Sequence, residues 1–277
     1  MKIGISTFAT DEGIAPAALG RALEERGFES LFLAEHSHIP VSRETPHPMG
    51  VELPRGYYRP VDPFVALGAI SSVTTSLRLG TGLTLLIQRD VIHTAKEVAT
   101  LDLISAGRVI FGVGVGWNRE EMRNHGTDPR VRGALLDEQL EAIREIWTKE
   151  EAQFHGRHVD FDPIFQWPKP VQRPHPPIYV GGNGEPAVRR VAAHANGWLP
   201  NAVREPDQVR GQLDLLREHA GPDVPVTATS AAGNRPDVLD AYAEAGVERV
   251  TLGLPSVPEA DTLAMLDRLA EIPLRYR

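Results

Sequence analysis

Short apolar runs alternate along the chain with longer amphipathic segments, and a glycine or a pair of small polar residues usually separates the two. Residues 15–26 place apolar side chains on one helical face, Gly27 follows at the position where a helix usually ends, and residues 30–34 form an apolar run. The same order of helix, stop and strand recurs down the chain. It predicts about eight strands, at residues 2–7, 30–34, 77–84, 108–115, 178–180, 198–199, 226–230 and 249–252.

Strands that alternate with helices imply a parallel sheet, and eight of them predict closure into a (β/α)8 TIM barrel. An open doubly wound sheet is the alternative, which the regular spacing disfavours. The length of 277 residues is normal for one α/β barrel, so we expect a single domain over residues 1–277. The expected helices cover residues 15–26, 62–72, 91–104, 132–149, 185–194 and 236–245.

Two long segments interrupt this rhythm, after the second and the fourth predicted strand. The first, residues 36–61, is rich in proline and histidine; the second, residues 128–177, holds the helix at 132–149 and a small hairpin at 154–161. Both follow the carboxyl ends of strands, where TIM barrels form their active sites, and loops of this length are usually lids or binding segments.

The composition narrows the classes of function. The chain has no cysteine, which excludes disulfides, thiolate metal sites and a cysteine nucleophile. Its formal charge of −8 argues against nucleic acid or an anionic membrane surface as partner. No apolar run is long enough to span a bilayer and the first residues already form a predicted strand, so we expect a cytoplasmic protein.

The segment from Gly107 to Gly126 contains the most informative strand. Glycines at every second position, ending at Gly116, leave one strand face bare, so that a flat ligand or another backbone can come close. Asn118 can cap the helix that follows. A Rossmann dinucleotide fingerprint is rejected here, because Trp117 stands where that motif needs a glycine.

His36 follows the second predicted strand, within Glu35-His36-Ser37-His38. A histidine at this strand end faces the barrel mouth and is suited to proton transfer near neutral pH. Alternatively it only anchors the loop that follows. An amidohydrolase-like metal site is disfavoured, because the fifth, sixth and eighth predicted strands do not end in the histidines and aspartate that such a site needs. We therefore expect no metal.

Other predicted strand ends also contain glycines, which let a ligand approach the backbone. Gly181-Gly182-Asn183-Gly184 precedes a helix and can form an anion site from free N–H groups, although a tight turn with an ordinary cap would look the same. The segment 79–84 suits either ligand access or a simple β-bulge. Trp117 is either a packing residue or the wall of an aromatic-binding cavity. Together these features describe a barrel mouth that accepts a flat, phosphate-bearing cofactor.

At this point the sequence resembles the bacterial-luciferase-like family of TIM barrels, in particular its F420-dependent oxidoreductases. The most specific block runs from Ala95 to Arg108 and continues into Gly112–Trp117 and Glu120-Glu121. A second block consists of residues 176–182 and 195–198. The resemblance covers nearly the whole chain.

The resemblance implies a set of site residues. His36 would be the active-site histidine beside C5 of the deazaflavin, and Glu35 would contact the ring where the family usually has aspartate. Trp117 replaces the catalytic glutamate of relatives that oxidise sugar phosphates, which favours a more apolar substrate; we expect Phe8 and Trp117 to line its pocket. The ring would rest on a bulge that often contains a non-proline cis peptide, and the phosphate on a glycine turn. These cofactor-binding positions are Gly82, Leu83, Thr84, Val115, Gly116, Gly181, Gly182, Asn183 and Gly184.

The expected function is hydride transfer between coenzyme F420 and a small organic substrate, with His36 moving the accompanying proton. An FMN-dependent monooxygenase on the same fold is one alternative. A flavin- or deazaflavin-binding protein without turnover is another, because a fold and a pocket do not prove chemistry. The resemblance also implies a homodimer, for which residues 65–70 in the second helix offer an apolar surface that could equally face the barrel.

Overall fold

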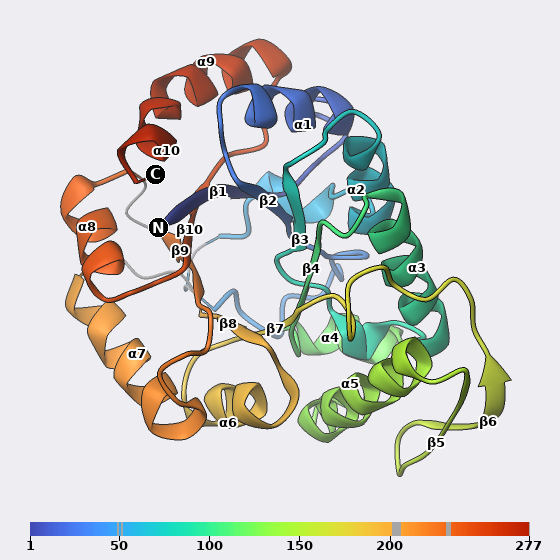
Figure 1. Ribbon diagram of the computed structural model, residues 1–277. Coiled ribbons are helices and arrows are strands. Elements are labelled where there is room, and N and C mark those ends of the chain that lie inside the picture. The colour runs from blue at the N-terminus through green and yellow to red at the C-terminus, as the bar shows by residue number, and fades with distance from the viewer. Residues whose placement is uncertain (49, 51, 201–205, 231–233, 277) are drawn as a thin grey trace.

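The computed structural model describes residues 1–48, 50, 52–200, 206–230 and 234–276. Eight parallel strands pair in the order β8-β7-β4-β3-β2-β1-β10-β9, and a bridge between Trp198 and Val226 joins the two edges. The sheet thus closes into the predicted TIM barrel, seen along its axis in Figure 1. Its strands are β1 (Lys2–Thr7), β2 (Ser30–Leu33), β3 (Arg78–Thr81), β4 (Val109–Val113), β7 (Ile178–Gly181), β8 (Gly197–Leu199), β9 (Thr227–Ser230) and β10 (Arg249–Gly253).

Helices form a ring outside these strands (Figure 1). They are α1 (Pro16–Glu25), α2 (Pro63–Ser71), α3 (Val91–Ile104), α5 (Arg132–Thr148), α6 (Glu185–His194), α7 (Pro206–Ala220), α8 (Pro236–Glu244), α9 (Glu259–Leu269) and α10 (Glu271–Arg275). The predicted helices are confirmed to within a few residues. The sequence analysis did not predict α7, α9 or α10, although the first two follow β8 and β10 as the alternation of the barrel requires. None of the helices in the described ranges has both the length and the apolar character needed to cross a bilayer.

Two apolar layers hold the barrel together. A large cluster fills the space between strands and helices, and a small one, Phe32, Ile110, Tyr179 and Leu199, lies inside the barrel with Leu83 packed on it. Glycine is required within the inner layer: a Cβ at Gly80 would lie 2.4 Å from the ring of Phe32. The bare strand positions of the sequence thus partly serve the packing of the barrel itself.

The segment that resembles the luciferase-like family most specifically is largely scaffold. Buried Arg108, just before β4, donates to the backbone carbonyl groups of Ser71, Thr74, Leu77 and Ser105. Asp102 in α3 accepts hydrogen bonds from the backbone N–H groups of Val171 and Gln172, at 2.8 and 2.9 Å. The two side chains thus tie the connection between α3 and β4 to the neighbouring segments 71–77 and 171–172.

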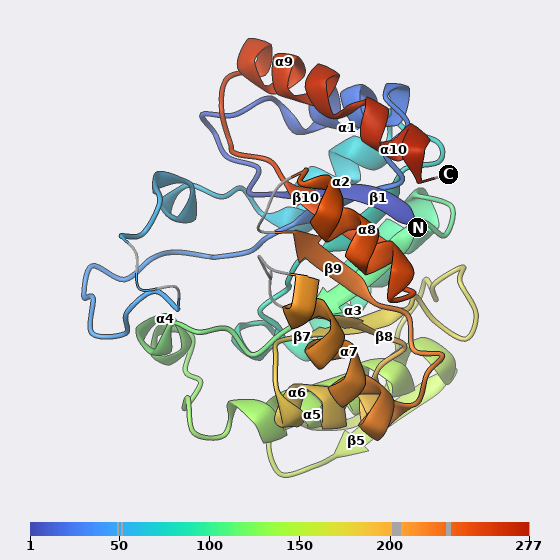
Figure 2. The same cartoon turned by 90° about the vertical axis from the view of Figure 1, so that its left-hand side faces the viewer.

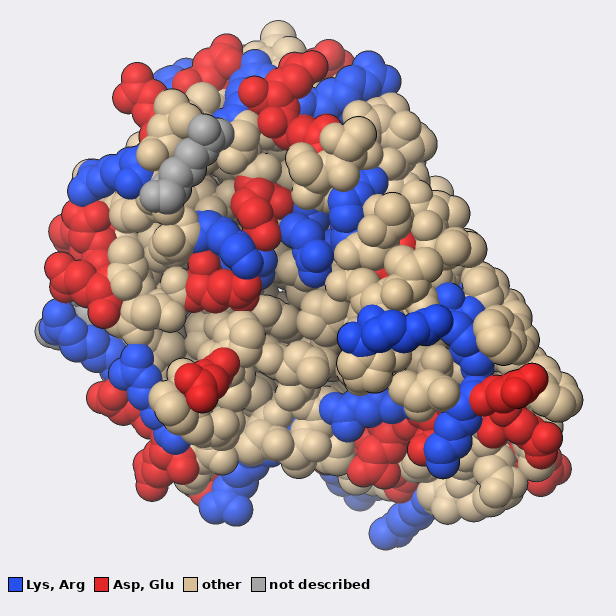
Figure 3. Space-filling model, viewed as in Figure 1, with Lys and Arg blue, Asp and Glu red and all other residues tan. Residues whose placement is uncertain are grey.

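Ion pairs occupy the strands' amino ends. Arg249 is buried and its Nε lies 2.7 Å from Oε2 of Glu29, while Lys2 pairs with Glu248 at 2.7 Å. Figure 3 shows positive and negative side chains intermixed over the face seen in Figure 1. The charges on this face are thus of both signs, and the carboxyl ends of the strands lie at the other end of the barrel.

Both predicted insertions begin at the carboxyl ends of strands, but the hairpin of the second packs along α5, where the N–H groups of His158 and Val159 donate to Glu138. Residues 36–61 follow β2 and include the short helix η1 (Arg55–Tyr58). After β4 come α4 (Arg119–Asn124), α5 and an antiparallel hairpin of β5 (Glu151–His155) and β6 (Asp160–Phe165), which extends further on both sides than the predicted residues 154–161. Figure 2 shows the loop after β2 and α4 projecting from the same end of the barrel.

Candidate active site

The carboxyl end of β2 carries a buried pair of His36 and Glu121. Nδ1 of His36 lies 2.8 Å from Oε2 of Glu121, and the other carboxylate oxygen accepts a hydrogen bond from the backbone N–H of Ser37 at 3.2 Å. Glu121 is fully buried and His36 is 7% exposed. The carboxylate holds a proton on Nδ1, which leaves Nε2 as the ring atom that can accept or deliver one.

Helix α4 positions this carboxylate. As predicted, Asn118 caps the helix: its Oδ1 accepts from the backbone N–H of Glu121 at 3.1 Å. The cap starts α4 directly after the turn that follows β4, so that Glu121 lies in the first helical turn, where a negative charge is favourable. The sequence analysis named Glu121 only within the block that resembles the family, and did not predict its bond to His36.

Aromatic rings surround His36. The ring centres of Phe8, Tyr57 and Trp117 lie 6.2, 5.4 and 5.8 Å from that of the imidazole. Nε2 of His47 lies 3.2 Å from the hydroxyl of Tyr57, and burial together with the charge of His36 lowers the pKa of His47. The structure thus places Phe8 and Trp117 beside the candidate catalytic group, and adds Tyr57 and His47 from the first insertion, which the sequence analysis missed.

Glu35 faces the segment after β3. One carboxylate oxygen accepts from the backbone N–H of Leu85 at 2.7 Å, and the other from Nε of Arg89 at 2.7 Å. Arg89 in turn contacts Asp62 and Glu97 at 2.8 and 2.9 Å. Both oxygens of Glu35 are therefore engaged in anchoring the loop that follows β3, and its predicted contact with the cofactor ring stays a prediction.

Residues predicted to back the ring converge around Leu83. The peptide bond between Gly82 and Leu83 is cis, as the family resemblance implied. A Cβ at Gly114 or at Gly181 would lie 2.7 or 2.2 Å from Cδ1 of Leu83, so both glycines make room for this side chain. Thr84 pairs with Val113 of β4. The ends of β3, β4 and β7 therefore meet at one place in the mouth.

The glycine turn before α6 has the backbone of an anion site. Gly182 and Gly184 have φ angles of +110° and +80°, which favour glycine, and Gly184 is the N-cap of α6 without a side-chain cap. Pro186 has no N–H, and the N–H groups of Ala187 and Val188 donate to the carbonyl of Gly184, so a phosphate here would bind the N–H groups of the turn before Pro186. Asn183 lies between the two glycines and is exposed.

A buried polar group near the central turn supports the same assignment. Nε2 of Gln88 is buried and has no hydrogen-bond partner among the described residues. It lies 3.8 Å from the place that a Cβ of Gly116 would occupy, and Gly116 has a φ of +65°. Buried donors are normally paired, so this one suits a polar ligand that approaches the glycine. The amide of Gln88 and the backbone of the glycine turn fit a flat heterocycle with a phosphate.

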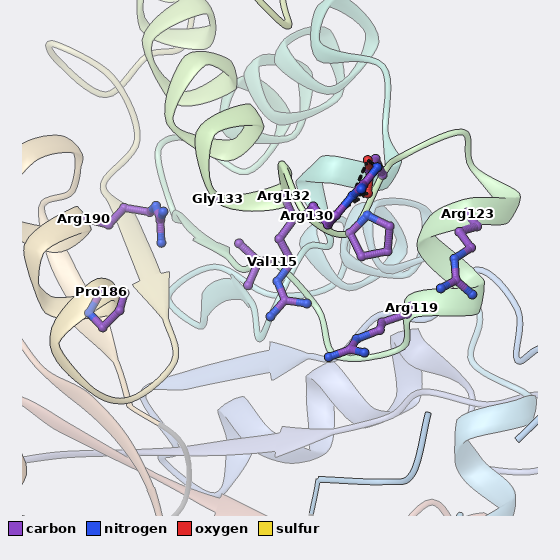
Figure 4. A pocket seen from close by; sticks show the side chains of 10 residues that line it. Val115, Arg119, Arg123, Arg130, Arg132, Gly133, Pro186 and Arg190 are labelled. Carbon is purple, nitrogen blue, oxygen red and sulfur yellow. Dashed lines mark hydrogen bonds and ion pairs between the residues drawn. The ribbon is translucent and has the colours of Figure 1, made fainter. Parts of the chain in front are cut away.

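Two cavities open beside these residues. The larger, of about 770 Å³, is lined by Val115, Pro186 and an arginine-rich wall (Figure 4). The smaller, of about 380 Å³, is lined by Gly116, Trp117 and part of the first insertion. Arg119 and Arg132 line both cavities. The sequence analysis missed these arginines, although four of them fall within residues 119–132.

The histidines after β2 do not converge on one point. His36 bonds Glu121, whereas Nδ1 of His38 lies 2.9 Å from the hydroxyl of Ser37 and its Nε2 lies 2.8 Å from the amide of Asn124. The described residues contain no group of three or more histidine, aspartate or glutamate side chains that could hold a metal ion. The arrangement can move a proton beside a flat, phosphate-bearing ligand.

Comparison with known proteins agrees with this geometry. A family model described as luciferase-like monooxygenase matches residues 12–272. An uncharacterised protein of Mycobacterium tuberculosis is 41% identical over 276 residues, which cover 98% of both chains. An FMNH2-dependent dimethylsulfone monooxygenase of Pseudomonas putida is 34% identical over 46% of this chain and 35% of its own.

Solved structures share the fold at low sequence identity. A monooxygenase from Streptomyces bottropensis has a TM-score of 0.81 at 21% identity, covering 100% of this chain and 99% of its own. An F420-dependent secondary alcohol dehydrogenase, solved with an F420–acetone adduct, has a TM-score of 0.77 at 19% identity and covers 100% of both chains.

Proposed function

The chain belongs to the luciferase-like monooxygenase family, and we propose that it is an oxidoreductase that transfers a hydride between coenzyme F420 and a small organic substrate. The observation that carries the proposal is the buried bond between His36 and Glu121 at the carboxyl end of β2. Reduction of a carbonyl, or oxidation of an alcohol, moves a proton together with the hydride, and this pair supplies a group that can hold one.

The residues of this chain have distinct tasks in the proposed reaction. Glu121 fixes the orientation and the tautomer of His36, and Nε2 of His36 gives a proton to the substrate oxygen or takes one from it. Phe8, Tyr57 and Trp117 exclude water and favour an apolar substrate. The deazaflavin, when bound, would supply or accept the hydride.

We assign the cofactor to the ends of β3, β4 and β7. Leu83 and its cis peptide would back the ring, Val115 and Gly116 would lie along it, and the turn from Gly181 to Gly184 would hold the phosphate. These roles rest on the glycines among these positions and on the absence of a side-chain cap at the start of α6. They remain proposals, as does the expected cytoplasmic location.

An FMN-dependent monooxygenase is the second candidate. The Pseudomonas putida relative, which acts on dimethylsulfone with FMNH2, favours it, since its similarity covers almost half of this chain. FMN and F420 both present a flat tricyclic ring and a phosphate, so the ring site alone suits either. We favour F420 because the proton-holding pair is placed beside the mouth, where hydride transfer to a carbonyl needs it.

Turnover by the protein loaded with F420 tests the proposal. Oxidation of reduced F420 would be followed by absorbance while a panel of ketones and aldehydes is added, and the reverse reaction with the corresponding alcohols. The proposal predicts substrate-dependent turnover with at least one apolar carbonyl or alcohol. Binding of F420 without turnover on any of them would favour a cofactor-binding protein, and oxygen-dependent turnover with FMNH2 would favour the monooxygenase.

A further inference from the structure

Four aromatic rings form a closed circuit that includes the candidate catalytic group. The ring centre of His36 lies 5.4 Å from that of Tyr57 and 5.8 Å from that of Trp117. On the other side, the ring centre of His47 lies 5.3 Å from that of Tyr57 and 5.5 Å from that of Trp117. Two imidazoles therefore alternate with two larger aromatic rings in the mouth of the barrel.

Tyr57 and His47 bring their polar atoms together within this circuit. Nε2 of His47 lies 3.2 Å from the hydroxyl oxygen of Tyr57. Burial raises the pKa of Tyr57, and burial together with the charge of His36 lowers the pKa of His47. The pair of Tyr57 and His47 is therefore uncharged near neutral pH, whereas His36 is bonded to the carboxylate of Glu121.

The short helix η1 holds Tyr57 in this place. Arg55, two positions before Tyr57, donates from Nε to Oε2 of Glu12 at 2.7 Å. Arg59, two positions after it, donates from Nε to Oδ1 of Asp11 at 2.7 Å. Because both arginines bond to the loop after β1, the turn that carries Tyr57 is tied to the barrel on both sides of the tyrosine.

The smaller cavity gives a ligand access to one side of the circuit. It is lined by Trp117 and by Pro46 and Pro48, which are the neighbours of His47 in the chain. The hydroxyl of Tyr57 has one hydrogen and two lone pairs, so its bond to His47 leaves it the capacity for a further hydrogen bond. A polar group of a ligand can provide this bond.

We propose that the hydroxyl of Tyr57 determines substrate specificity by donating a hydrogen bond to a second oxygen of the substrate. His47 is a positioning residue: its Nε2–H donates to the phenol oxygen, so that the phenol hydrogen points to the ligand. Because the pair is uncharged and lies among aromatic rings, the substrate class is a neutral apolar compound with two oxygen functions, such as a diketone or a hydroxyketone. The inference rests on the proposed function for the reaction at His36.

Binding of two ketones that differ by one carbonyl group tests the proposal. 1-Phenylpropane-1,2-dione and propiophenone share a phenyl ring and a three-carbon chain, and only the first has a second carbonyl. Their Kd values would be measured by calorimetry on the full chain without added cofactor, for the wild type, Tyr57→Phe and Tyr58→Phe. Tyr58 is the matched control, because it is the next residue of η1 and its hydroxyl accepts from Arg43 instead.

The wild type and Tyr58→Phe should bind the dione at least tenfold more tightly than propiophenone, because the monoketone leaves the phenol hydrogen of Tyr57 without a partner. Tyr57→Phe, which keeps the ring but has no hydroxyl, should lose this preference. Equal affinities in the wild type, a preference that persists in Tyr57→Phe, or no binding of either ketone would overturn the proposal.

Two substitutions of His47 test its positioning role. The amide of His47→Gln can still donate an N–H to the hydroxyl of Tyr57, whereas the side chain of His47→Leu cannot. We expect His47→Gln to keep most of the preference for the dione and His47→Leu to lose it. A preference that both variants keep, or that both lose, would contradict the role of His47.

Turnover of the same two ketones separates this inference from the proposed function. A preference for the dione in binding, without oxidation of reduced F420 by any ketone, would contradict the proposed function alone. Oxidation of reduced F420 with equal kcat/KM and equal Kd for the two ketones would contradict the role of Tyr57 alone. Both proposals predict F420-dependent turnover in which the dione has the higher kcat/KM.

Discussion

His36 and Glu121 stand 85 positions apart in the chain, and a hydrogen bond of 2.8 Å joins them in the mouth of the barrel. The bond connects the end of β2 to the first turn of α4, so two neighbouring parts of the mouth share one buried carboxylate. Because the carboxylate holds the proton on Nδ1, Nε2 of His36 is the ring atom that exchanges protons with a ligand.

Loss of the imidazole should slow catalysis more than binding. We expect His36→Ala to lower kcat by about 10²–10⁴-fold, the usual contribution of general acid–base catalysis, while the Kd of the cofactor stays within a few-fold. His36→Asn, which is polar but does not titrate, should be nearly as slow. The pH–rate profile of the wild type should show a limb that both variants lack. A variant that keeps most of its turnover would reduce His36 to an anchor of the loop.

Glu121 is expected to act through His36. In Glu121→Gln the amide no longer holds the Nδ1 proton with a negative charge, so we predict a fall in kcat of about tenfold or more with little change in cofactor affinity. The downfield NMR signal of the Nδ1 proton of His36 should disappear as well. Glu120→Gln on the same short helix is the matched control, since Glu120 accepts a hydrogen bond from Thr45 instead. Equal effects of the two substitutions would point to a loss of helix structure.

We expect protonation of Glu24 at acid pH to lower the free energy of unfolding. Burial alone would raise the pKa of this carboxyl group, but the hydrogen bonds that it accepts from Ser76, Leu77 and Thr75 lower it to about 2. Because the folded pKa lies below the ordinary value of 4.5, this stabilisation is present above pH 4.5 and is lost as the pH falls toward 2. We predict that Glu24→Gln lowers the free energy of unfolding by about 2 kcal/mol at pH 7.

Denaturant unfolding at several pH values measures this effect. The difference between wild type and Glu24→Gln should shrink steadily between pH 4.5 and pH 2. A difference that is the same at both pH values would show that the charge of Glu24 does not contribute.

The protein is expected to self-associate, but the apolar stripe proposed in the second helix only partly faces outward. Ala66 and Ile70 are buried against the barrel, whereas Val65 is 75% exposed. Other exposed apolar side chains, Phe165 and Trp167, lie in and after β6. Light scattering at micromolar concentration should give the mass of a dimer, and the double variant Phe165→Ser/Trp167→Ser should shift it toward the monomer. A monomeric wild type would contradict the expectation.

The barrel was predictable from the sequence because its signals are local. Each strand is a short apolar run, and glycines such as Gly27 and Gly246 end the helices with positive φ angles of 76° and 77°. His36 and the glycine turn before α6 could be placed in the mouth because parallel strands align their carboxyl ends. The periodicity therefore located the candidate site before any side-chain contact was known.

The contacts within the site could not be predicted in the same way. Glu121 contributes a favourable charge to its own helix, and nothing local reveals that its carboxylate also reaches His36. Tyr57 and His47 belong to an insertion without a periodic pattern. Four arginines within residues 119–132 are visible along the chain, but only the folded structure shows that they line a cavity where α4, α5 and α6 meet.

A comparison of cofactors tests the central claim most directly. The purified protein would be titrated with F420 and with FMN in the same buffer, with fluorescence reporting binding. Hydride transfer with F420 predicts saturable binding of F420, with a Kd at least tenfold below that of FMN, a difference of about 1.4 kcal/mol. FMN that binds more tightly than F420 would contradict the account and favour the monooxygenase.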